Sequence, residues 1–118
     1  MKLLAIAVFL LLTTTTNDVL NGRWESKPSE KGNVTGVLFK NGNILEAYTN
    51  KKPFASGRYF FNAADSVLSF VDNGCNGASA VYKVQFFSNS DSLRFAVIMD
   101  TCTQRRTGMQ RLVMGRKK

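Results

Sequence analysis

Apolar and polar residues alternate in short stretches along most of the chain, and turn residues separate one stretch from the next. A period of two is typical of strands that bury one face. The stretches lie at 20–24, 34–40, 44–49, 55–62, 66–72, 78–87, 93–101 and 106–114. No convincing helical period interrupts them. The pattern therefore predicts an all-β fold, an eight-stranded antiparallel up-and-down barrel.

Alternation also predicts which side chains face the inside of this barrel. The inward set is largely aromatic, and we take its members as the candidate ligand-binding residues: Phe39, Tyr48, Tyr59, Phe61, Phe70, Tyr82, Phe86 and Phe95, with Leu68 beside them. An eight-stranded barrel has room for its own side chains or for one small molecule. Because so many rings point inward, we expect little free volume. The tyrosine hydroxyls would give a pocket a few polar anchors.

The two cysteines lie on either side of one predicted hairpin. The strands 78–87 and 93–101 are joined by the polar loop 88–92, and Cys75 and Cys102 stand almost equally far from its centre. They should therefore meet at the open end of the hairpin. We predict a Cys75–Cys102 disulfide, which would add on the order of 3–4 kcal/mol to stability.

The chain begins with a segment unlike the rest. Lys2 precedes an uninterrupted apolar run at 3–12, and threonines fill 13–16. This order is typical of a secretory signal peptide, and the run is too short to span a bilayer comfortably. We predict a signal peptide at 1–18, a barrel domain at 19–118, and no integral membrane anchor. A secreted or periplasmic location also suits a disulfide.

Composition argues against catalysis. The formal net charge is +8, and the chain has no histidine. Neither a Ser–His nor a Cys–His pair can be assembled, and no histidine is present to complete a zinc site. We therefore predict a protein that is not an enzyme, with no cofactor and no metal site. The simplest interpretation of the positive charge is solubility.

Several short motifs point to one family. Leu-x-Gly-x-Trp at 20–24 contains the only tryptophan, and it is followed by Phe-Lys-Asn-Gly at 39–42, Gly-Arg-Tyr at 57–59 and Asp-Thr-Cys at 100–102. With this order of strands and turns, the chain resembles small exported bacterial lipocalin-like domains of the calycin superfamily. The resemblance covers nearly all of the chain after the predicted signal peptide. The Thr-Asp-Tyr signature of larger lipocalins is absent.

The resemblance implies how one end of the barrel closes. In that family the Gly-x-Trp lies on the first strand, the indole packs across the barrel bottom, and a basic side chain from the last strand lies against it. Gly22, Trp24 and Arg106 are the corresponding residues expected here. Arg105 and Arg111 are alternatives to Arg106, because alternation does not fix the register of the last strand.

The resemblance also implies a function, an exported binding domain for a small apolar or amphipathic ligand. Two alternatives stay open. One is a macromolecule-binding barrel, which would inhibit a secreted enzyme or bind an acidic polymer through a basic face. The other is a structural barrel with a filled interior. Nucleic acid is not expected as a partner, because export and a disulfide weigh against it. The sequence predicts no particular oligomeric state.

Overall fold

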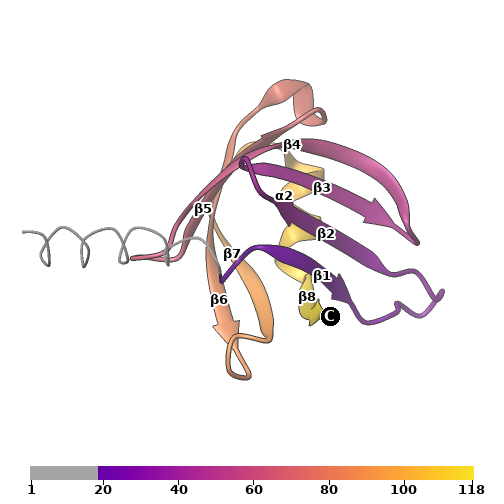
Figure 1. Cartoon of the computed structure of the whole chain (residues 1–118). Coiled ribbons are helices and arrows are strands. Elements are labelled where there is room, and N and C mark those ends of the chain that lie inside the picture. The colour runs from indigo at the N-terminus through magenta and orange to yellow at the C-terminus, as the bar shows by residue number, and fades with distance from the viewer. Residues whose placement is uncertain (1–18) are drawn as a thin grey trace, which may run out of the picture.

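The computed structural model describes residues 19–118 as a closed barrel of antiparallel strands in up-and-down order (Figure 1). Residues 1–18, where the signal peptide is predicted, lie outside the described residues. The strands are β1 (Gly22–Ser26), β2 (Thr35–Lys40), β3 (Ile44–Thr49), β4 (Lys52–Asn62), β5 (Val67–Asp72), β6 (Ala80–Phe87), β7 (Ser92–Asp100) and β8 (Val113–Lys117). Pairing of β8 with β1 closes the barrel. The predicted eight-stranded barrel is confirmed, and its architecture is consistent with a lipocalin-like fold.

The first seven predicted strands are present. β3 has the predicted bounds, and the other six differ by one to three residues at one or both ends. Burial alternates along β4, β5, β6 and the first half of β7, as in Leu93, Arg94 and Phe95, but not along β2 and β3. The period-two pattern therefore predicts where these strands lie and, for most of them, which face is buried.

The prediction for the end of the chain is wrong. Most of the stretch at 106–114 belongs to a helix, α2 (Thr103–Arg111), and β8 begins only at Val113. Met109 on α2 and Leu112 just after it pack against the barrel core, and Arg105 is ion-paired with Asp100 on β7. These contacts join residues on different elements, and alternation along a single stretch carries no information about them.

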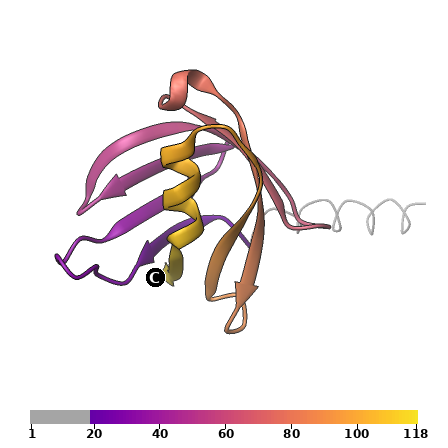
Figure 2. The same ribbon diagram turned by 180° about the vertical axis from the view of Figure 1, so that it is seen from behind.

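The helix takes the place of missing strand pairing. Only Ser92, Leu93 and Arg94 of β7 pair with β8, so the rest of β7 has no strand on that side. α2 lies beside β7, and Figure 2 shows it standing across the opening between β7 and the strands β2 and β3.

Among residues 19–118 no helix is long and apolar enough to cross a membrane.

A disulfide fixes the start of this helix. Cys75 begins a short 3-10 turn, η1 (Cys75–Gly77), between β5 and β6, and Cys102 directly precedes α2. The two are bonded, with 5.9 Å between their Cα atoms. The predicted disulfide is therefore confirmed, and it fastens the first turn of α2 to the β5–β6 connection.

Trp24 and two phenylalanines pack together at one end of the barrel. The ring centroids of Trp24 and Phe86 are 6.1 Å apart, and those of Phe61 and Phe86 are 6.2 Å apart. Trp24 is fully buried, and its Nε1 donates a hydrogen bond to the carbonyl oxygen of Leu20 at 2.9 Å. We call this the closed end.

Candidate functional site

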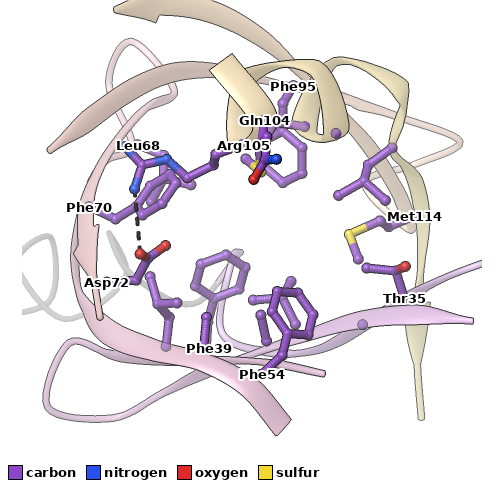
Figure 3. Close-up of a pocket in the computed structure, with 18 residues that line it drawn as sticks. Thr35, Phe39, Phe54, Leu68, Phe70, Asp72, Phe95, Gln104, Arg105 and Met114 are labelled. Atoms are coloured by element: carbon purple, nitrogen blue, oxygen red, sulfur yellow. Dashed lines mark hydrogen bonds and ion pairs between the residues drawn. The ribbon is translucent and has the colours of Figure 1, made fainter. Parts of the chain in front are cut away.

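A cavity of about 330 Å³ lies within the barrel, bounded on one side by α2 (Figure 3). The strands line it with apolar side chains, mainly Val37, Phe39, Leu45, Ala47, Ala55, Leu68, Phe70, Phe95 and Met114. α2 and the residue after it add Gln104, Arg105, Gly108, Met109 and Leu112. Among residues 19–118, the only other lining residues with polar side chains are Thr35 and Asp72. The cavity is thus an apolar chamber with a few polar groups.

The mouth of the cavity can be located from exposure. Phe54 on β4 lines the cavity and yet is 61% exposed, and Gln104 and Gly108 of α2 are exposed as well. Figure 3 shows Phe54 on the side of the chamber opposite Gln104. The opening therefore lies between β4 and α2, and a ligand would enter there.

The structure divides the predicted ligand-binding residues into three groups. Phe39, Phe70 and Phe95 line the cavity. Four others belong to the core but lie outside the cavity lining, namely Tyr59, Phe61, Tyr82 and Phe86. The remaining one, Tyr48, does not face the interior. Sequence reasoning missed Leu45, Phe54 and Met109, although the alternation of 44–49 already placed Leu45 on the opposite face from Tyr48.

Tyr48 lies on the outer face of the barrel, so its assignment to the interior is wrong. Its neighbour Ala47 lines the cavity, and successive side chains of a strand point to opposite faces. The Tyr48 hydroxyl donates to a Glu25 oxygen at 2.6 Å, and the Arg23 guanidinium lies 5.2 Å from the ring centroid. A Cβ at Gly36 would lie 2.2 Å from this ring. Glycine therefore gives the tyrosine its space outside.

The expectation of little free volume is also wrong. Phe61 and Phe86 pack with Trp24 at the closed end, and Tyr48 is outside. Only some of the predicted rings are left to surround the cavity. Beyond Arg94, β7 has α2 beside it and no strand. The cavity lies between this helix and the strands.

The basic residue against Trp24 is Arg116. Its guanidinium carbon lies 4.2 Å from the ring centroid, and the two residues are paired across β1 and β8. The prediction of Arg106 is wrong, because 103–111 is helical and the last strand begins later than expected. Arg106 instead donates to the carbonyl oxygen of Asp100 at 2.9 Å. The predicted Gly22 does lie here, with a φ of +120° that favours glycine.

Arg116 also donates hydrogen bonds to backbone carbonyl oxygens at the closed end. Its guanidinium donates to the carbonyl oxygens of Val19 at 2.8 Å, Asn21 at 3.2 Å and Ser90 at 3.2 Å. It therefore ties the chain before β1 to the β6–β7 loop and covers the indole.

We expect Arg116→Ala to lower the free energy of unfolding by about 2–3 kcal/mol, because it removes a cation–π contact and several charge-assisted hydrogen bonds. The emission of Trp24 should shift to the red as water reaches the ring. Urea titration and fluorescence spectra measure both effects. Arg106→Ala is the control, and it should leave the emission maximum unchanged. A shift with Arg106→Ala alone would contradict the assignment.

A buried polar cluster lies beside the cavity, where α2 meets β5, β6 and β7. Arg105 donates from Nε to one Asp100 oxygen at 3.0 Å and from Nη2 to the other at 2.9 Å. Nη1 contacts Asp72 at 3.5 Å, and Nη2 also donates to the carbonyl oxygen of Ala78 at 3.0 Å. The Tyr82 hydroxyl donates to Asp100 at 2.6 Å. We call Asp72, Arg105, Asp100 and Tyr82 the arginine cluster.

The pKa values within this cluster follow from burial and hydrogen bonding. Burial alone would raise the pKa of Asp100, but hydrogen bonds from Arg105, Tyr82 and the Cys102 amide outweigh it, so the pKa lies below its usual value. Burial, and then the hydrogen bond to Asp100, raise the pKa of Tyr82. At neutral pH the cluster therefore contains an ionised Asp100 and a neutral Tyr82.

The geometry defines a closed antiparallel β-barrel whose apolar cavity opens beside a short helix. No protein-family model, no curated protein and no solved structure matches the chain significantly. Within residues 19–118, no three side chains of the metal-binding types lie close enough together to hold a metal ion.

Proposed function

We propose that this protein is an exported, non-enzymatic, lipocalin-like domain that binds one small apolar or amphipathic ligand inside its barrel. The observation that carries the proposal is the cavity of about 330 Å³, with its apolar wall and its mouth between Phe54 and α2. Ligand sites in proteins are typically concave and mostly apolar, with a small number of polar groups and volumes of about 300–1,000 Å³.

The energetics of the cavity support a ligand. A dry void costs on the order of 20–25 cal/mol per Å³, so a dry cavity of this size would cost several kcal/mol, comparable with the whole stability of a small domain. Water that enters through the mouth finds few hydrogen-bond partners on walls such as Leu45 and Phe95. Its replacement by an apolar ligand is therefore favourable. The cavity also weighs against a barrel that serves only as a filled structural module.

Two features support export. The Cys75–Cys102 bond is of a kind that persists in oxidising compartments, and the residues at 1–16 have the pattern of a signal peptide. The absence of histidine leaves no Ser–His or Cys–His pair, which supports a binding role.

The test uses the uncharged fluorescent probe N-phenyl-1-naphthylamine, whose emission rises in apolar surroundings. We expect saturable binding at one site and a rise in the thermal midpoint with probe concentration. Ala47→Phe should abolish binding, because Ala47 lines the cavity and the added ring would occupy it. Ala47→Leu is a smaller version of the same change, for use if the first variant does not fold.

The matched control is Glu46→Phe. Glu46 is the neighbouring residue and lies on the outer face, where it pairs with Lys40. The same ring is then added on the other side of the wall, and probe binding should persist. If the probe does not bind, or binds equally well to folded Ala47 variants, the proposed function is wrong and binding of a macromolecule on the outer surface becomes the better hypothesis.

A further inference from the structure

The polar groups of the cavity carry information about the ligand, given the proposed function. Within the part of the chain that the structure describes, the polar side chains that a bound molecule would meet are those of Thr35, Asp72, Gln104 and Arg105. Two of these are neutral, and two are charged and belong to the arginine cluster. Which polar group a ligand can carry therefore depends on the ion pairs and hydrogen bonds that Asp72 and Arg105 already make within the protein.

Arg105 is already bound to protein groups. Its Nε and Nη2 contact both oxygens of Asp100, Nη2 also contacts the carbonyl oxygens of Ala78 and Ser79, and Nη1 contacts Asp72. Its side chain is only 9% exposed. One face of the guanidinium lies 5.1 Å from the Phe70 centroid. At most one N–H of Nη1 could reach a ligand, so this arginine is poorly placed to bind a carboxylate bidentately.

The charge of the cluster is negative. Two carboxylates, Asp72 and Asp100, face the single guanidinium of Arg105, so the sum of the three is −1 when both acids are ionised. Asp72 is the carboxylate that lines the cavity, and its side chain is 10% exposed. An anionic ligand group would thus lie next to an acid at short range and in low dielectric, where repulsion is strong.

Asp72 keeps one oxygen for a ligand. Its Oδ1 accepts hydrogen bonds from the Gly74 amide at 2.8 Å and from Arg105, while Oδ2 has no hydrogen-bond partner among residues 19–118. Figure 3 shows the Asp72 carboxylate at the edge of the chamber, below Arg105 and Phe70. A hydroxyl or amide N–H on the ligand could donate to this oxygen.

We propose that the cavity selects an uncharged apolar molecule that carries a hydrogen-bond donor, such as an alcohol, and disfavours the anion of a fatty acid. The positive charge of the whole protein opposes this preference only weakly. Most basic side chains are exposed and outside the lining, Lys52 near Phe54 included, and salt at physiological strength screens them beyond about 8 Å. Arg106 is partly buried and donates to the Asp100 carbonyl oxygen, so it offsets part of the negative charge, but it does not line the cavity.

The test compares decan-1-ol with decanoate, two chains of equal length. A cavity of about 330 Å³ has room for roughly ten groups of the size of a water molecule. Calorimetric titration at pH 7.5 and 0.15 M salt should show that the alcohol binds at least about tenfold more tightly, which corresponds to about 1.4 kcal/mol.

Asp72→Asn identifies the cause. It brings the charge of the cluster to zero and keeps an oxygen for the Gly74 amide, so the preference for the alcohol should fall below about threefold. Asp65→Asn is the matched control. It changes the net charge of the protein equally, but Asp65 is exposed in the β4–β5 turn and does not line the cavity. The preference should be unchanged.

The outcomes separate this inference from the proposed function. Equal or tighter binding of decanoate, or an unchanged preference in Asp72→Asn, overturns the inference and leaves the ligand-binding function in place. The same holds if neither decan-1-ol nor decanoate binds while N-phenyl-1-naphthylamine does. Failure of the naphthylamine probe as well overturns the proposed function itself.

Discussion

Arg105→Ala is expected to lower the free energy of unfolding by about 3–5 kcal/mol, because it leaves buried carboxylates without their counter-charge. Asp100 is 4% exposed, and Arg105 contacts both of its oxygens. The variant also loses the link between α2 and the backbone at Ala78. Urea denaturation followed by far-UV circular dichroism measures the change. A loss of less than about 1 kcal/mol would contradict the structure of the arginine cluster.

Arg111→Ala is the matched control for this prediction. It removes the same residue type from the same helix, but Arg111 is exposed in the last turn. Its contribution is limited to a favourable interaction with the helix dipole, at most about 1 kcal/mol. A loss as large as that of Arg105→Ala would mean that helix charge, and not the ion pair, stabilises α2.

The effect of Arg105→Ala should also depend on pH. The pKa of Asp100 is lowered in the folded protein, from its usual 3.8, so the stability it contributes is complete above that pH. The contribution is lost as the pH falls through the folded-state pKa. The difference between wild type and variant should therefore be largest near neutral pH and shrink in strong acid.

Gly57→Ala is expected to destabilise the barrel by about 3 kcal/mol or more, as overpacking against a backbone that cannot move aside. A Cβ at position 57 would lie 1.9 Å from the carbonyl oxygen of Val71 and 2.7 Å from the Cα of Asp72. Both are backbone atoms of β5, the strand that pairs with β4 at this point. The substitution must therefore push two strands apart, and thermal and urea denaturation measure the loss.

Gly108→Ala provides the opposite result for the same chemical change. Apart from its chain neighbours and the backbone of α2 itself, no atom lies within 4 Å of a Cβ at position 108, which is exposed at the mouth of the cavity. Alanine is a better helix former than glycine, so this variant should gain about 0.5–1 kcal/mol. If both substitutions had similar small effects, the close approach of β4 and β5 at Gly57 would be wrong.

Local patterns in the sequence determined the strands and the disulfide. Alternation predicted β1 to β7 because a strand with one buried face needs apolar residues at every second position, as in Leu93 and Phe95. The Cys75–Cys102 pair followed from the symmetry of one hairpin, since residues equally distant from a turn lie opposite each other in antiparallel strands. These features depend on neighbours along the chain, and the sequence contains them directly.

The candidate site was predicted only in part. Phe39, Phe70 and Phe95 belong to a regular alternation, and they line the cavity. Alternation also placed Phe61 and Phe86 inward, but it cannot tell one end of a barrel from the other. Their contact with Trp24 at the closed end depends on the stagger of the strands around the barrel.

The helix and the partner of Trp24 were decided by tertiary structure. The segment 103–111 has no capping side chain at Cys102 and no clear apolar face, so its own sequence favours a helix only weakly. The Arg105–Asp100 ion pair, the disulfide at Cys102 and the burial of Met109 stabilise it as α2. A helical residue advances 1.5 Å and a strand residue about 3.3 Å. Because 103–111 is a helix, the last strand begins later in the sequence than alternation predicted. Arg116, and not Arg106, thereby came to lie over Trp24, and the cavity beside α2 was left open.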